Sequence, residues 1–148
     1  MIGKIVVCAV ASLLLAEVSL AADWEGVDSE PEAVIVTRNA DGSPRETTIW
    51  FVFVGSELYV RAVRASRWGR NAERRPEVFF RAGDTETRAL ATRVVDANTL
   101  ASVRQAVEEK YPDSNWWAGV MRAMLGGIKV FHLTPGTSRH DAAPRVPR

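Results

Sequence analysis

The sequence predicts a mainly β domain with added helices, arranged as a small antiparallel barrel. Short apolar runs alternate with turn-forming residues through the early part of the chain, and long helical periodicity comes only later. No long crossover helix separates the early runs, so neighbouring strands are expected to be antiparallel. Closing such a sheet into a barrel removes exposed strand edges.

The first predicted strand is the β-branched run Ala33–Thr37, and Asp41-Gly42 then forms a tight turn. The next run, Thr47–Val54, is apolar at consecutive positions, so both of its faces are expected to be covered. One face would lie in the barrel. The other would meet a helix or a second subunit.

Leu58–Val63 completes the first hairpin, and "SRWGRNAERRPE" then predicts a short helix. Ser66 is the expected N-cap, and Pro76 closes this segment. A second hairpin follows, with "VFFRA" as one strand and Thr85–Val95 as the other.

A long helix is expected next, because four large residues recur at helical spacing: Leu100, Val103, Val107 and Tyr111. Asp96 or Asn98 can cap its start, and Pro112 stops it. Residues 115–125 ("NWWAGVMRAML") suggest a further helix that ends at two glycines, and the last strand is Ile128–Leu133. The expected fold is therefore mainly β with α, with six strands and two or three flanking helices.

Residues 1–21 have the pattern of a secretory signal peptide, with a positive start, an apolar run and small residues before a cleavage site after Ala21. A polar lead (22–32), the barrel domain (33–134) and a disordered tail (135–148) are expected to follow. The protein is then periplasmic or secreted, without a stable membrane span after cleavage. A retained anchor is the alternative, although the apolar run is short for a span.

The composition of the mature chain excludes several classes of function. Cys8 lies in the signal, so the mature chain has no thiol for disulfides, catalysis or metal binding. Loss of Lys4 and Glu17 leaves 18 basic and 17 acidic residues. A chain so close to neutral has no global field to attract nucleic acid.

Arginine recurs every third residue in "YVRAVRASRWGRN", at Arg61, Arg64, Arg67 and Arg70. Guanidinium groups beside the start of a helix favour a phosphate site. The alternative is a solvated surface on which these arginines pair with acidic neighbours such as Glu73. The position of the run, between a strand end and a helix start, favours the phosphate site.

Other motifs for catalysis or metal binding are absent from the sequence. His132 and His140 are isolated, and no nucleophile elbow or glycine-rich phosphate loop occurs. No catalytic residue and no metal ligand is therefore assigned. If the protein is an enzyme, a bound cofactor is expected to carry the chemistry.

Four segments in this order resemble one family: "DGSPRETTIWFVFVGSELYVRA", "ASRWGRNAERRPEVFFRAGDTETRALATRV", "EEKYPD" and "IKVFHLTP". They resemble the flavin-binding split-barrel superfamily, typified by pyridoxamine 5'-phosphate oxidase, and are nearest its deazaflavin-dependent nitroreductase-like branch. The similarity covers roughly Val34–Pro135. It implies a six-stranded split barrel and a homodimer, with FMN or a deazaflavin at the subunit interface and with the outer face of the doubly apolar strand as the subunit contact.

The resemblance also implies the residues of a cofactor site. The candidates for phosphate contact are Arg61, Arg64, Ser66 and Arg67. Trp68 and Asn71 would shape the loop and helix that present them, while Trp50 and Tyr59 would line the ring site. This chain departs from the family pattern in two places, since the usual phosphate-loop lysine is absent and Arg75 stands where the family has asparagine.

Two functions follow as expectations. The first is an exported oxidoreductase that uses FMN or a deazaflavin to reduce a small organic substrate. The second is a non-catalytic periplasmic module of the same fold that holds a phosphorylated small molecule.

Overall fold

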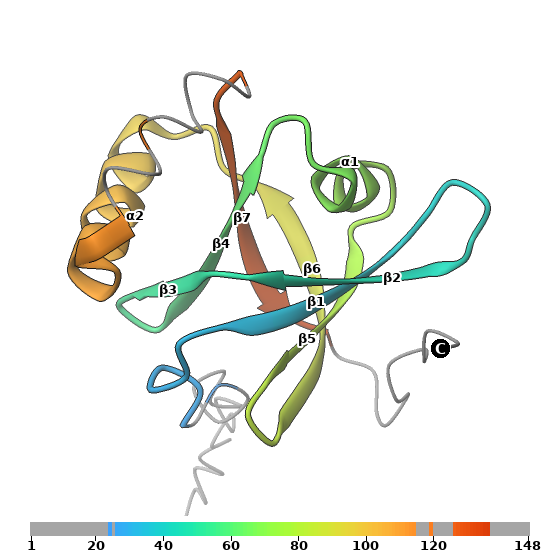
Figure 1. Cartoon of the computed structure of the whole chain (residues 1–148), viewed down its shortest axis with the longest axis horizontal. Helices are drawn as coiled ribbons and strands as arrows, with labels where there is room; N and C mark the ends of the chain where they lie inside the picture. Colours follow the sequence, from blue (N-terminus) through green and yellow to red (C-terminus); the bar gives the residue numbers. More distant parts are fainter. Residues whose placement is uncertain (1–23, 25, 115–118, 120–125, 137–148) are drawn as a thin grey trace, which may run out of the picture.

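In the part of the chain that the structure describes, seven antiparallel strands form one curled sheet, and two α-helices lie against it (Figure 1). The structure is a computed structural model that describes residues 24, 26–114, 119 and 126–136. The elements are β1 (Ala33–Arg38), β2 (Pro44–Ile49), β3 (Phe51–Val54), β4 (Glu57–Val63), α1 (Arg67–Arg74), β5 (Glu77–Ala82), β6 (Thr85–Arg93), α2 (Ala97–Lys110), a 3-10 helix (Pro112–Ser114) and β7 (Ile128–Pro135). This confirms a mainly β fold with flanking helices, of which two α-helices lie within the described residues.

The prediction of six strands was wrong, because the run Thr47–Val54 is two strands. The break falls at Trp50, between β2 and β3. β2 pairs with β1, whereas β3 pairs with β4. The strand changes its pairing partner at this point. The hydrophobic pattern of the sequence does not indicate such a change, so the break could not be predicted from it.

The strand order is β2-β1-β5-β6-β7-β4-β3. β2 and β3 therefore form the two edges of the sheet, although only Trp50 separates them along the chain. A flat sheet would place these edges far apart, so the sheet must curl until they meet. The break at Trp50 is where the barrel closes.

Two hydrophobic clusters occupy the two sides of the β3–β4 hairpin. The larger one fills the barrel and contains Phe51, Phe80 and Phe131, each at most 1% exposed. The smaller one lies on the outer side, where Val52 packs with Val107 of α2. Both faces of β3 are thus covered, and a helix of the same chain covers the outer face. In the β2 half of the predicted run Thr48 is exposed, so two covered faces are confirmed for β3 alone.

The two helices start at residues that the sequence identifies as caps. The Ser66 hydroxyl accepts a hydrogen bond from Gly69 N at 3.3 Å and caps α1. Of the two candidates for α2, Asp96 is the cap, because its carboxylate accepts from Thr99 N at 2.8 Å. In Figure 1, α2 stands beside β3 and β4, and α1 lies on the other side of β4.

The β1–β2 turn forms at Asp41-Gly42 as predicted. Gly42 has φ 87°, a left-handed conformation that glycine adopts without steric cost, and the Asp41 carboxylate accepts from Ser43 N at 2.9 Å. The N-terminal lead contributes two buried side chains, Trp24 and Val27, to the barrel core. The Trp24 ring packs edge-on to Phe80 at 5.4 Å, so the core extends beyond the strands.

Several predictions fall outside the described residues. They are the signal peptide (1–21), the helix over 115–125 and the tail beyond 136. β7 reaches Pro135, two residues past the predicted end at Leu133. Among the residues that are described, no helix is both long and apolar enough to cross a membrane.

Candidate functional site: an aromatic cavity at the strand break

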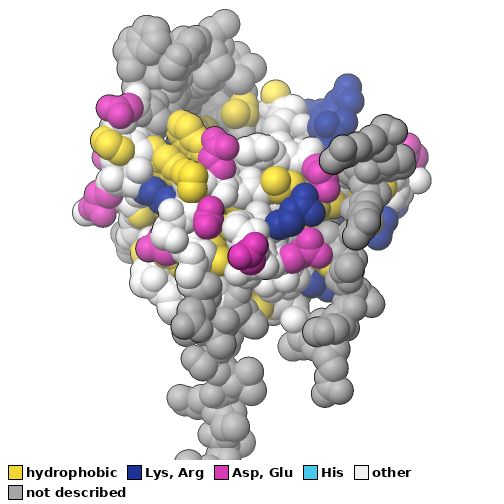
Figure 2. Space-filling view, turned by 60° about the horizontal axis from the view of Figure 1, so that its bottom comes forward, with side chains coloured by type: hydrophobic (Ala, Val, Ile, Leu, Met, Phe, Trp, Pro, Cys, Tyr) yellow, Lys and Arg dark blue, Asp and Glu magenta, His cyan; other side chains and the backbone are white. Residues whose placement is uncertain are grey.

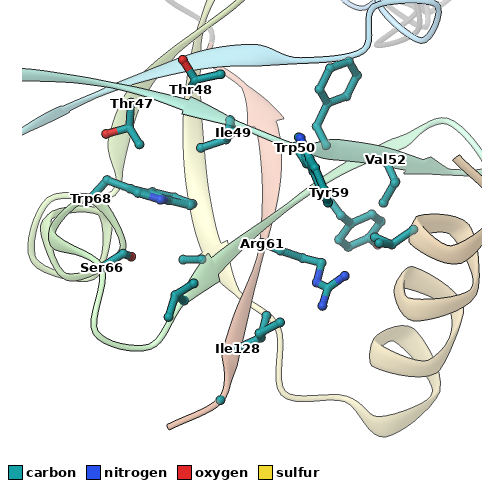
Figure 3. Close-up of a pocket in the computed structure, with 15 residues that line it drawn as sticks. Thr47, Thr48, Ile49, Trp50, Val52, Tyr59, Arg61, Ser66, Trp68 and Ile128 are labelled. Carbon is teal, nitrogen blue, oxygen red and sulfur yellow. The ribbon is translucent and has the colours of Figure 1, made fainter. Parts of the chain in front are cut away.

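A cavity of about 400 Å³ opens beside the break between β2 and β3 (Figure 3). Its walls come from both broken strands, from β4 and from the starts of α1 and β7. The lining residues are Thr47, Thr48, Ile49, Trp50, Phe51, Val52, Tyr59, Arg61, Ala62, Val63, Ser66, Trp68, Val107, Gly127 and Ile128. Small-molecule sites in proteins have volumes of this order.

Four aromatic side chains line the cavity, and one of them, Phe51, is also part of the barrel core. Trp68, 5% exposed, projects from the first turn of α1 and packs on Phe131 with ring centroids 5.7 Å apart. Tyr59 lies on β4, and Trp50 lies at the strand break with 42% of its surface exposed. Figure 3 shows Trp68 on the opposite side of the cavity from Trp50 and Tyr59. Aromatic walls of this kind suit a flat organic ring.

Arg61 is the positively charged side chain in the described lining. It is half-buried on β4, opposite Val130 of β7, and Figure 3 shows it extending between Tyr59 and Ile128. Ser66 and the first amides of α1 lie at the same cavity, on the other side of β4. An arginine together with a helix start is a suitable arrangement for an anionic group.

Tyr59 is held from outside the cavity by His132. Their rings stack with centroids 5.0 Å apart, and His132 Nε2 also contacts the Glu57 carboxylate. Burial, followed by the negative charge of Glu57, raises the pKa of Tyr59 above 10.0. The Tyr59 hydroxyl therefore keeps its proton at neutral pH and can donate a hydrogen bond to a ligand.

Tyr111 at the end of α2 fixes the strand break. Its hydroxyl accepts from Phe51 N at 3.3 Å and lies 3.0 Å from Phe51 O and 2.9 Å from Pro31 O. These contacts satisfy the backbone groups of Phe51 at the point where β3 begins. The Tyr111 ring also stacks on Trp50, with centroids 4.6 Å apart and planes within 9°. Trp50 is thereby oriented along the cavity wall.

The structure brings together five of the eight side chains that the sequence proposes for the cofactor site. They are Trp50, Tyr59, Arg61, Ser66 and Trp68.

The other three proposed side chains do not line the cavity. Arg64 and Arg67 are exposed. Asn71 is 2% exposed, and its amide donates to Thr37 Oγ1 at 3.2 Å and to Asn39 Oδ1 at 3.0 Å. Asn71 therefore joins α1 to the end of β1, a supporting position.

Sequence reasoning did not identify several lining residues, among them Thr47, Thr48 and Ile128. The threonines lie in an apolar run, and nothing in their local pattern distinguishes them from other strand residues. Tyr111 was predicted as a helix residue on the apolar face, without its role at the break. No residue spacing along the chain signals these contacts, because they join segments about 60 residues apart.

The described lining contains hydroxyl groups but no carboxylate, imidazole or thiol. Across the described ranges, no three His, Cys, Asp or Glu side chains are grouped as metal ligands. A lining of this composition can bind and orient a ligand, and it supplies no strong general base.

The fold is that of the split-barrel proteins, as three solved structures show. A putative pyridoxamine 5'-phosphate oxidase from Listeria innocua superposes with TM-score 0.55 at 16% identity, over 74% of this chain and 86% of that one. HutZ, a heme storage protein from Vibrio cholerae, gives 0.60 at 19%, over 74% and 84%. An F420 reductase gives 0.56 at 20%, over 76% and 93%. At these identities the likeness concerns the fold alone.

Within that class, the chain belongs to the family described as uncharacterized protein conserved in bacteria (DUF2255), whose sequence profile matches residues 23–125. No curated protein shows significant sequence similarity to the chain.

Proposed function

We propose that the protein is an exported oxidoreductase that binds FMN or a deazaflavin in the aromatic cavity and reduces a small organic substrate. The observation that carries the proposal is the combination of aromatic walls with Arg61 and the start of α1 in one cavity of about 400 Å³. The proposal is supported by the fold, which this chain shares with an F420 reductase.

The side chains present fit such a cofactor. Trp50 and Tyr59 offer flat surfaces for a ring system, and Arg61 and Ser66 offer donors for a phosphate. The bound flavin or deazaflavin would supply the hydride chemistry, which this lining cannot. The protein residues would bind the phosphate, orient the ring and exclude water. Tyr59, protonated at neutral pH, would donate a hydrogen bond to the ring or the substrate.

Arg61, Arg64 and Arg67, which precede or begin α1, provide a direct test. We expect Arg61→Gln to weaken binding of FMN or of a deazaflavin by about tenfold or more, because a charge-assisted hydrogen bond in the cavity is lost. Arg64→Gln and Arg67→Gln remove the same charge from exposed positions outside the cavity. These two variants should bind almost as the wild type does.

Fluorescence titration of the purified chain measures all four proteins with each cofactor. Equal weakening in all three variants would show that binding depends on general charge and not on the cavity. Absence of saturable binding of either cofactor at high micromolar concentration would rule the proposal out.

The second candidate is a non-catalytic periplasmic module that holds a phosphorylated small molecule in the same cavity. The observation in its favour is that the described lining lacks a general acid or base apart from the Tyr59 hydroxyl. A thermal-shift screen separates the two functions. Stabilisation by simple phosphate esters that Arg61→Gln abolishes, with none by either cofactor, would favour the binding module.

Both candidate functions include a homodimer. The exposed edge of the cavity at Trp50 is consistent with a second subunit that completes the site. Sedimentation of the purified chain, with and without cofactor, measures this directly.

A further inference from the structure

A second hollow lies on the outer face of the barrel, where β1, β5 and β6 run side by side. Its volume is about 640 Å³, and it shares no lining residue with the aromatic cavity. We call it the arginine groove, because Arg38, Arg74, Arg75 and Arg88 line it. We propose that the arginine groove is a binding site for a phosphate monoester that carries an apolar group.

The strand register explains the apolar floor of the groove. Val36 of β1 lies opposite Phe79 of β5, and Phe79 lies opposite Arg88 of β6. Leu90 follows Arg88 on the same face of β6, since alternate residues share a face. Ile35, Phe80 and Ala89, the neighbours of these residues along the chain, point into the barrel core. An apolar strip therefore crosses the outer face, and Leu90 is 43% exposed on it.

The charges above this floor do not balance. Glu77 is the acidic residue in the groove, and it forms an ion pair with Arg88 at 2.7 Å. Four arginines and one glutamate leave an excess of three positive charges. Elsewhere on the same face of β5, Arg81 is matched by two glutamates, Glu46 and Glu86. Figure 2 likewise shows basic and acidic side chains interspersed on the face it presents, so unbalanced positive charge is not general to the surface.

The arginines hold their positions without using all their donors. Arg38 Nη1 donates to Gly42 O at 3.1 Å, and Arg74 Nη2 donates to the Asn71 side chain at 2.6 Å. Each guanidinium has five N–H donors, so both can bind a ligand as well. The Arg75 guanidinium makes no hydrogen bond or ion pair with another described residue. Its described electrostatic neighbour is Asp41, whose carboxylate is hydrogen-bonded by Ser43.

These observations define the ligand. Arg38, Arg74 and Arg75 make no ion-pair contact with a described carboxylate, so their guanidinium groups suit a compact dianion, which they can bind through paired hydrogen bonds. The strip of Val36, Phe79 and Leu90 suits an apolar substituent on that anion. The volume is that of a small-molecule site. Residues 137–148 do not complement the groove, because they carry three arginines and one aspartate.

Phenyl phosphate is the probe, because it joins a dianion to an apolar ring. Its binding to the full chain can be followed by amide chemical shifts in a ¹⁵N NMR titration. We expect saturable shifts at residues of the groove, weaker binding as salt rises, and binding about tenfold tighter than that of inorganic phosphate, which lacks the ring. Phenol, which lacks the charge, should not bind measurably.

Matched variants assign the binding to the groove. Arg75→Gln should weaken phenyl phosphate binding about tenfold. Arg104→Gln is the control, because it removes the same charge from an exposed position on α2 and should have no effect. Arg61→Gln should also have no effect, which separates this site from the aromatic cavity and its proposed cofactor. Thermal unfolding of each variant checks that the fold is retained.

Four results would overturn the proposal. They are shifts confined to the aromatic cavity, equal weakening by Arg75→Gln and Arg104→Gln, binding of phenyl phosphate no tighter than that of inorganic phosphate, and tight binding of a DNA duplex without binding of phenyl phosphate.

Discussion

The first turn of α1 borders the aromatic cavity, whereas its last turn borders the arginine groove. Ser66 and Trp68 face the cavity, and Arg74 and Arg75 line the groove. The cavity combines four aromatic side chains with one arginine in its described lining, and the groove combines four arginines with an apolar strip. One short arginine-rich segment thus contributes to two sites of different chemistry.

This difference shows that arginines evenly spaced in the sequence can lie at different places in the structure. Arg61, Arg64 and Arg67 are evenly spaced, but a strand end, a turn and a helix start lie between them. Arg61 reaches the cavity from β4, and the other two are exposed. Evenly spaced residues lie on one face only if they belong to the same helix or strand.

Trp68→Ala should have the largest effect, because it removes the anchor of α1 and so disturbs both sites. We expect the free energy of unfolding to fall by about 3–5 kcal/mol, the usual cost of deleting a buried aromatic side chain. Trp50→Ala is the control, since Trp50 is 42% exposed and should lose only about 1 kcal/mol of stacking on Tyr111. Urea denaturation measures both. Equal losses would contradict this assignment of the two tryptophans.

Asn71→Ala should affect the two sites unequally. It removes the donor to the buried Thr37 hydroxyl, at a cost of about 1–3 kcal/mol, and it releases Arg74. Phenyl phosphate binding should weaken severalfold while cofactor binding in the cavity changes little. The exposed Asn98 on α2 offers a control substitution to Ala. An equal loss at both sites would show that Asn71 supports α1 as a whole and not its last turn.

The two sites also differ in the positive charge that lies near them. Arginines are exposed around the groove, whereas Lys110 behind the cavity wall places its Nζ 3.6 Å above the Phe51 ring without a hydrogen bond to any described group. Burial lowers the pKa of Lys110 below 10.5, although the charge of Asp28 opposes the shift. Folding therefore favours release of this proton.

Lys110→Met should have the smallest effect, within about 1 kcal/mol at pH 7, because methionine keeps the packing and removes a buried charge. Between the folded and unfolded pKa values of Lys110, the unfolded chain binds more protons, so stability of the wild type rises with pH. The variant lacks this rise. Urea denaturation between pH 7 and pH 10 should show the free energy of unfolding of the wild type rising relative to that of Lys110→Met. A difference that does not change with pH would contradict the lowered pKa of Lys110. Both proteins contain Tyr59 and Tyr111, so titration of these residues cancels.

Local chemistry made much of the fold predictable from sequence. Ser66 as a cap, the Asp41-Gly42 turn and the stop before Pro112 each depend on residues within a few positions of one another. The mainly β class also follows from local patterns, because strand-forming runs and turn residues alternate. Five of the proposed site residues lie together because they flank the hairpin and helix start that the sequence indicates.

The sequence by itself determined which of the described segments are strands and helices, and where most of them begin and end. Only the tertiary structure decided that the strand breaks at Trp50, that Tyr111 holds the break, and that Arg61 and Arg75 line different cavities. The physical reason is the range of the interactions. Caps and turns are formed by neighbours in sequence, whereas strand partners and cavity walls are chosen by the closure of the whole sheet.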